Sequence, residues 1–219
     1  MGLDMYLEKT KKITENLTGR ELHVINDYLD WKECGKDCSF SEWCGHSMRE
    51  VDPNLASEYR KEYIQRYFRW DTEHRYGYNS IFQPVHQWRK ANHIHNWFVE
   101  NVQGGTDDCG IYVVTEEDLI LLNELCKEVL DSSRLIKGKI INGYTINENG
   151  EVPIYEDGAY IEDPTVAQEL LPTVSGFFFG SQEYDEWYYR DVEDTYNITK
   201  ELLEETDFSK EVVLYSSSW

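Results

Sequence analysis

Short β-prone runs alternate along this chain with separate amphipathic helices, and this alternation most constrains its fold. Residues 3–7, 110–114 and 174–179 are predicted strands, the last of them buried. The glycine-punctuated segment 136–162 is typical of a hairpin or meander. The spacing of apolar side chains predicts helices over residues 20–31, 54–69, 86–102, 116–131, 164–171 and 183–206. Such a mixture favours an α+β fold, with several helices and a short mixed sheet.

A chain of 219 residues can form one large domain or two small ones. We expect a single α+β domain over residues 1–219, in which residues 20–83 form an inserted subdomain that carries a cysteine cluster. No apolar run approaches the 18 residues of a membrane span. No basic segment followed by an apolar core opens the chain, and its five cysteines are an odd number. Both features predict a protein of the reducing cytoplasm.

Negative charge is concentrated in the second half of the chain. Residues 1–100 carry 16 acidic and 14 basic side chains, whereas residues 101–219 carry 26 acidic and 7 basic ones. A surface field of this sign repels nucleic acid and anionic membranes, and it attracts proteins with basic sites. The strongest candidates are proteins that handle nucleic acid, because their grooves carry Lys and Arg for phosphates. The alternative is an acidic protein with a well-solvated surface.

A cysteine-rich segment within the expected insert has the composition of a zinc site. Cys34, Cys38, Cys44 and His46 follow the pattern C-x3-C-x5-C-x-H. Three thiolates and one imidazole would complete a tetrahedral zinc shell, which favours a structural role over a catalytic one. A polar loop of this length buries too little apolar surface to order itself, so a metal would supply that energy. His23 is an alternative fourth ligand, and three free cysteines beside a surface histidine are the simpler interpretation.

Two polar side chains fall on helix faces that are otherwise apolar. His95 shares a face with Trp88 and Phe98 in the predicted helix 86–102, and Asp191 lies near the centre of the inner face of the last helix. Buried polar groups need partners, so we hypothesise a contact between His95 and Asp191. A structural histidine is one interpretation of this pattern. The others are metal ligation and acid–base chemistry, which would make the chain a metal-dependent hydrolase or nuclease that uses the region of His93 and His95.

The last predicted helix carries a line of carboxylates on its outer side. Glu186, Glu193 and Glu204 span 18 residues, or roughly 27 Å at 1.5 Å per residue. A solvated amphipathic helix would show the same pattern. Acidic groups beside aromatic ones also suit docking against a basic groove of another protein. The predicted partner-binding residues are Glu183, Glu186, Glu193, Glu204, Trp187 and Tyr188.

Three blocks of sequence carry a resemblance to known proteins. They are residues 1–7 (MGLDMYL), residues 88–103 (WRKANHIHNWFVENVQ), and residues 169–186, which contain ELLPT, SGFFFGS and YDE. Together they resemble a family of small proteins from phages and mobile elements of Gram-positive bacteria. The resemblance implies a bacterial host cell, and the family has no established chemistry. Residues 20–83 are not part of this resemblance.

An acidic, metal-binding protein of this size and source is similar to some anti-CRISPR inhibitors of type II effector nucleases. Those effectors hold nucleic acid in long basic channels. The resemblance implies a phage-derived inhibitor that binds a basic surface of such an effector and blocks DNA loading through charge complementarity. Metal-dependent hydrolysis is the alternative function, and a viral accessory protein without inhibitory activity is a third.

Overall fold

The computed structural model describes residues 2–34, 37–62, 64–69, 75–148, 150–176 and 179–219, without the side chains of residues 33–34, 64–69, 75–80, 146 and 151. In the described part, seven α-helices accompany small antiparallel sheets, which confirms the α+β class. The predicted mixed sheet is wrong, because every strand pairing among the described residues is antiparallel. The helices are α1 (Gly19–Cys34), α2 (Phe40–Cys44), α3 (Pro53–Tyr59), α4 (Asn92–Asn101), α5 (Glu116–Ser132), α6 (Thr165–Leu170) and α7 (Glu186–Glu205), with short 3-10 turns η1 (Met48–Glu50) and η2 (Arg60–Glu62). The strands are β1 (Asp4–Lys11), β2 (Ile64–Arg69), β3 (Arg75–Ser80), β4 (Gln83–Arg89), β5 (Ile111–Val114), β6 (Leu135–Asn147), β7 (Gly150–Ile161) and β8 (Glu211–Ser218).

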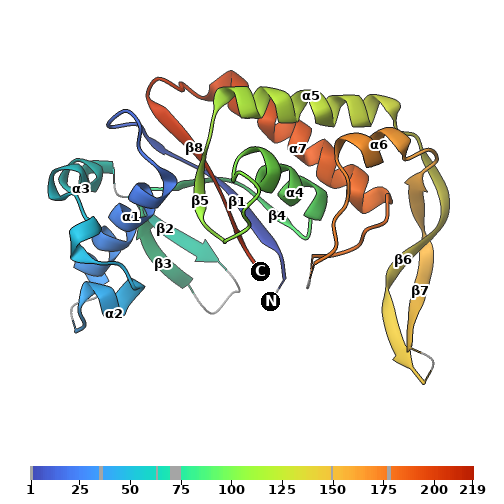
Figure 1. Cartoon of the computed structure of the whole chain (residues 1–219), viewed down its shortest axis with the longest axis horizontal. Coiled ribbons are helices and arrows are strands. Elements are labelled where there is room, and N and C mark those ends of the chain that lie inside the picture. Colours follow the sequence, from blue (N-terminus) through green and yellow to red (C-terminus); the bar gives the residue numbers. More distant parts are fainter. Residues whose placement is uncertain (1, 35–36, 63, 70–74, 149, 177–178) are drawn as a thin grey trace.

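A four-stranded antiparallel sheet in the order β4-β1-β8-β5 forms the centre of the fold (Figure 1). β8 lies between β1 and β5, so the strands from the two ends of the chain are direct neighbours. In the register of this pair Leu7 lies opposite Tyr215. The sequence prediction included β1 and β5 but missed β8.

Alternate residues of β8 face two different hydrophobic cores, as the two-residue period of a strand requires. Val213 and Tyr215 join a core built with β1, β4, α4, α5 and α7. Val212 and Leu214 join a second core, whose other buried members come from residues 22–82. The segment expected as an insert therefore packs around a cluster of its own, and its helices gather at one end of the molecule (Figure 1).

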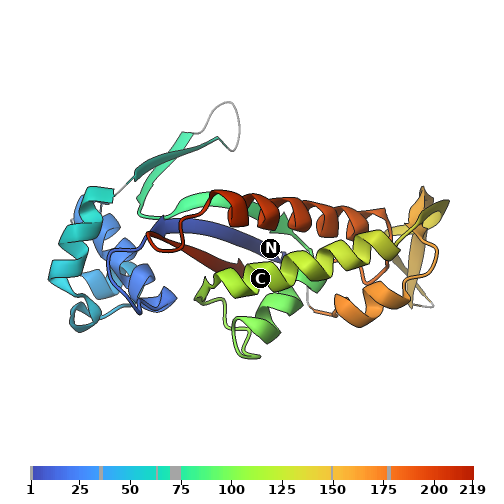
Figure 2. The ribbon, with the colours of Figure 1, turned by 90° about the horizontal axis from the view of Figure 1, so that it is seen from above.

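Helices α5 and α7 run side by side over one face of the sheet (Figure 2). Asn123 of α5 joins them, because its amide donates to the carbonyl of Tyr196 and to the hydroxyl of Thr199, each at 2.9 Å. Thr115 caps α5 in a capping box with Asp118, and the helix starts at Glu116, where the sequence predicts it. Every helix in the described residues is too short or too polar to span a bilayer.

Four of the predicted elements differ from the structure. Residues 86–89 belong to β4, because pairing with β1 replaces the start of the predicted helix 86–102. The predicted helix 54–69 ends at Tyr59, and η2 and β2 follow it in place of its second half. The last helix starts at Glu186, since Asp185 caps it. The described part of the predicted strand 174–179 is irregular.

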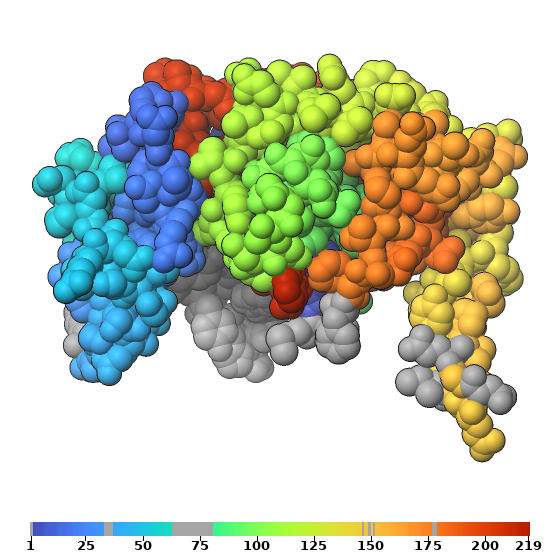
Figure 3. All heavy atoms as spheres, in the orientation of Figure 1, coloured from blue at the N-terminus to red at the C-terminus, as the bar shows by residue number. Residues whose placement is uncertain are grey.

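Strands β6 and β7 form the predicted hairpin, and it extends away from the body of the molecule (Figures 1 and 3). Several of its apolar side chains are exposed rather than packed against the core. These exposed side chains include those of Tyr144, Ile154, Tyr155 and Tyr160. An arm that displays aromatic side chains to solvent is a candidate contact surface for another protein.

Candidate functional site

The outward surface of α5 and α7 is strongly acidic. The two helices contain 13 carboxylates, six in α5 and seven in α7, against three basic side chains. The helices are neighbours (Figure 2), so their exposed carboxylates are brought close together in the fold. The exposed ones are Glu116, Glu117, Glu124, Glu128, Asp131, Glu193, Asp194, Glu201, Glu204 and Glu205, which we call the acidic face.

The predicted carboxylates of the last helix differ in how far they reach solvent. Glu193 and Glu204 are exposed on α7 and belong to the acidic face. Glu183 is exposed but precedes the helix, and Glu186 is only half-exposed in its first turn. The prediction therefore found part of this surface. It missed the contribution of α5, which only the packing of the two helices reveals.

Of the two predicted aromatic anchors, only Trp187 is available at the surface. Its side chain is 50% exposed, whereas that of Tyr188 is 3% exposed. The Tyr188 hydroxyl donates to the carbonyl of Leu171 at 2.9 Å. Tyr188 therefore belongs to the core, and its prediction as a surface anchor is wrong because adjacent helical residues point about 100° apart.

A cleft of about 480 Å³ lies between residues 141–144 of β6 and the start of α7. Trp187 and Tyr144 line it from these two elements. Arg89 and Lys90 also line it, so this cleft has mixed charge, whereas acidic side chains predominate on α5 and α7. Two exposed aromatic side chains, Trp187 and Tyr144, thus lie at the end of α7, a helix that carries part of the acidic face.

Asp191 lies on α7 and lines the same cleft. Burial is the largest cause that raises the pKa of Asp191 to about 7, the nearby carboxylates Asp194 and Asp185 contribute to the rise, and Arg190 opposes it.

His95 is buried on α4 with both ring nitrogens engaged. Its Nδ1 is hydrogen-bonded to the Tyr215 hydroxyl at 2.7 Å, and its Nε2 to Oδ2 of Asp107 at 3.0 Å. The hypothesised contact of His95 with Asp191 is wrong, because Tyr215 and Asp107 already occupy both nitrogens of the imidazole ring. His95 ties α4 to the central strand β8, which is a structural role.

His93 is also buried on α4, and its ring packs on that of Tyr188 with centroids 4.2 Å apart. Burial lowers the pKa of His93 to about 3, so the imidazole is neutral at physiological pH. Neither His93 nor His95 belongs to the group of described residues that could hold a metal ion. The geometry thus gives no support to metal chemistry centred on these two histidines.

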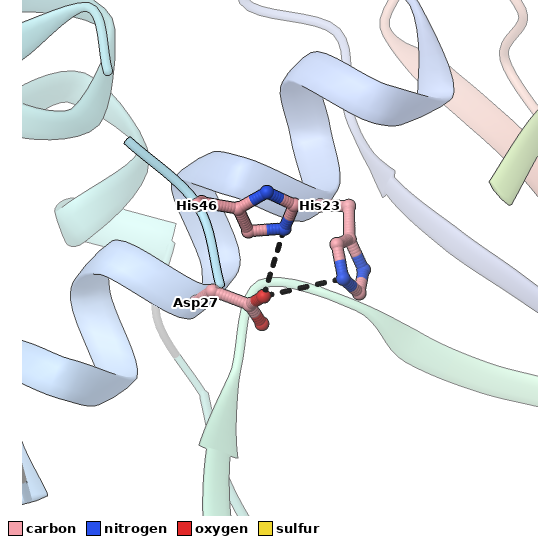
Figure 4. Close-up of side chains that lie close together, drawn as sticks. All are labelled: His23, Asp27 and His46. Atoms are coloured by element: carbon pink, nitrogen blue, oxygen red, sulfur yellow. Dashed lines mark ion pairs between the residues drawn. The ribbon is translucent and has the colours of Figure 1, made fainter. Parts of the chain in front are cut away.

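The predicted zinc set of Cys34, Cys38, Cys44 and His46 is not assembled in the described part of the chain. The side chain of Cys34 lies outside the described residues. Cys38 and Cys44 are half-buried, and the thiol of Cys44 donates to the carbonyl of Phe40 in its own helix. His46 instead lies with His23 and Asp27, whose ligand atoms are all within 4.8 Å of one another (Figure 4).

Asn92 joins two sequence blocks that lie about 80 residues apart. Its side-chain amide donates to the carbonyls of Phe179 and Ser181, at 3.2 and 2.8 Å. Its side-chain oxygen accepts from the backbone amide of Val174 at 2.9 Å. The segment 174–181 is irregular where described, so these three bonds replace the ladder that a strand would provide.

We expect Asn92→Ala to lower the free energy of unfolding by about 2 kcal/mol, because three backbone groups lose their partner and only some regain one from water. Urea denaturation measures the loss. Hydrogen exchange at the amide of Val174 should accelerate more than exchange within α5. Asn197→Ala, at an exposed position of α7, is the control. An equal effect of the two substitutions would contradict the role given to Asn92.

Comparisons with protein-family models, curated proteins and solved structures found no match to this chain. The resemblance of its sequence blocks to phage and mobile-element proteins therefore stays a prediction.

Proposed function

We propose that this protein is an acidic inhibitor that docks on a basic surface of a nucleic-acid-handling enzyme, and that a type II CRISPR effector nuclease is this enzyme. Binding there would block DNA loading. The observation that carries the proposal is the acidic face, where neighbouring helices present ten exposed carboxylates. The assignment to a CRISPR effector rests on the sequence resemblance.

Size and shape support a groove as the target of the acidic face. α7 has 20 residues, which corresponds to a length of about 30 Å. A CRISPR effector holds its heteroduplex of about 20 base pairs in a basic channel that is longer than this. A helix pair of this length can cover part of such a channel and displace the phosphates that normally neutralise it.

Aromatic side chains next to the acidic face support a protein partner rather than a diffuse ion atmosphere. Charge complementarity chiefly speeds association and selects the partner, while buried aromatic groups supply much of the affinity. Trp187 and Tyr144 are 50% and 58% exposed and line the cleft beside α7. Both are positioned to be buried when a partner covers that end of the acidic face.

The direct test is inhibition of DNA cleavage by a purified type II effector loaded with its guide RNA. We expect the protein to prevent binding of target DNA. Its affinity for the effector should fall as the salt concentration rises from about 50 to about 500 mM, because salt in this range screens surface charges. A filter-binding assay reports DNA loading, and calorimetry at two ionic strengths reports affinity. Salt-independent binding, or no binding, would contradict the proposal.

Charge reversal on the acidic face separates its role from that of net charge. The variant Glu193→Lys/Glu201→Lys/Glu204→Lys should weaken inhibition about 10- to 100-fold, because each reversal replaces an attraction by a repulsion. The control is Glu15→Lys/Asp37→Lys/Glu58→Lys, which changes net charge equally at exposed positions outside α5 and α7. Equal loss in both variants would show that net charge alone matters and would contradict a defined docking face.

A further inference from the structure

We infer that His23, Asp27 and His46 bind a zinc(II) ion. This inference does not depend on the proposed docking function, because none of the three residues belongs to the acidic face. The site lies in the part of the chain whose core is separate from that of α5 and α7.

Two of the ligands come from one face of α1. His23 and Asp27 are four residues apart, which places their side chains one above the other on the helix. Nε2 of His23 lies 3.2 Å from Oδ2 of Asp27. Both groups are partly exposed, so a metal could reach them without any opening of the core.

The turn after α2 brings the third ligand to this face. Gly45 ends α2 with φ +77°, a left-handed conformation that favours glycine, and its amide donates to the carbonyl of Ser41. The next residue, His46, then points at α1, and its Nε2 lies 3.3 Å from Oδ2 of Asp27 (Figure 4). Phe40 holds α2 in place, since it is 2% exposed and packs against Trp31 of α1.

The ligand spacing fits a tetrahedral metal ion. Bonds of 2.0–2.1 Å at the tetrahedral angle put neighbouring ligand atoms about 3.3 Å apart. The two distances from Asp27 Oδ2, 3.2 and 3.3 Å, match this edge length. The two imidazole nitrogens lie within 4.8 Å of each other. A small inward rotation of the exposed ring of His23 would complete the triangle.

The donor set selects the class of metal. Two imidazoles and one carboxylate suit zinc and related transition metals, whereas magnesium and calcium prefer oxygen ligands alone. Three protein ligands also leave one tetrahedral position for water or another small ligand. Here that position can face a cavity of about 540 Å³, because His23 and His46 both line it together with Cys109 and Tyr112. The site thus differs from a closed structural zinc centre.

Zinc titration of the full chain, in competition with a chromophoric chelator, tests this site. We expect one zinc ion per chain and an increase in Tm when zinc is added to chelator-treated protein. Replacing an outer-shell partner of a metal ligand typically costs 10- to 100-fold in affinity, so loss of a ligand should cost about 100-fold or more. His23→Ala and His46→Ala should therefore abolish binding in the micromolar range, and Asp27→Asn should weaken it.

The matched control is the triple variant Cys34→Ser/Cys38→Ser/Cys44→Ser, which should keep its zinc. Far-ultraviolet circular dichroism verifies that each variant is folded, and His23→Ala is the most informative because its side chain is 43% exposed. Loss of zinc in the cysteine variant with retention in His23→Ala would overturn the inference, as would failure of the wild-type chain to bind zinc. None of these outcomes bears on the salt dependence of effector binding.

Discussion

Phe98→Ala is expected to lower the free energy of unfolding by about 3–5 kcal/mol, the usual cost of removing a large aromatic group from a core. Phe98 is fully buried on α4. Its ring stacks on that of Tyr215 with centroids 3.9 Å apart, and it packs edge-on against the ring of Trp97 and at a tilt against that of Trp88. The substitution therefore leaves a cavity between α4 and the central strand. Urea denaturation monitored by tryptophan fluorescence measures the change.

Two variants check that this loss comes from the cavity. Phe98→Leu fills much of the same space and should recover more than half of the stability. Trp43→Ala removes a side chain that is 41% exposed and should change stability by less than about 1 kcal/mol. A loss below about 1 kcal/mol for Phe98→Ala would mean that α4 does not pack on β8 as described.

Asp191→Asn is expected to stabilise the protein at pH 8, although it removes a carboxylate from a folded helix. The pKa of Asp191 is raised from 3.8 to about 7 by burial first and by Asp194 and Asp185 next. In the unfolded chain the group ionises near pH 4, so the folded state binds the proton more tightly. The contribution of Asp191 to stability therefore falls as pH rises from about 4 to about 7 and then stays level, and the difference between variant and wild-type chain isolates this contribution.

The size of this effect follows from the shift in pKa. A shift of about three units corresponds to about 4 kcal/mol, and relaxation around the ionised group reduces the expected gain to about 2–4 kcal/mol at pH 8. At pH 4 the variant and the wild-type chain should be equally stable. Thermal denaturation across this range measures the difference. The control is Glu124→Gln, which removes an exposed carboxylate of α5 that does not contribute to the pKa shift of Asp191. A gain that does not depend on pH would contradict the assigned cause.

The sequence alone predicts those helices and strands whose ends are determined by neighbouring residues. The predicted helix 116–131 matches α5 because Thr115 and Asp118 form its cap from adjacent residues. The hairpin of residues 136–162 is likewise made by neighbouring segments. In contrast, the apolar spacing of residues 86–102 fits a helix throughout. Only pairing with β1 makes the first part a strand, and the chain turns at Lys90 with φ +64°.

The candidate sites also contain parts that the sequence predicts and parts that arise only when distant segments pack together. The charge count found α7 but not α5, since the acidic face exists only after two helices pack together. The density of cysteines suggested their zinc site, whereas the spacing of His23 and Asp27 by four residues was an equally visible helical signal. His46 joins them through the turn at Gly45, which sequence periodicity does not encode.

The position of β8 has a consequence for how this chain folds. β1 and β5 are linked in the sheet only through β8, and the pairing of Leu7 with Tyr215 joins residues about 200 positions apart. Such a high contact order predicts slow folding, because a long loop must close before the pairing stabilises it. During synthesis, β1 and β5 are made before β8, the strand that lies between them. Until β8 is added, the strand edges that it pairs with stay exposed to chaperones or to aggregation.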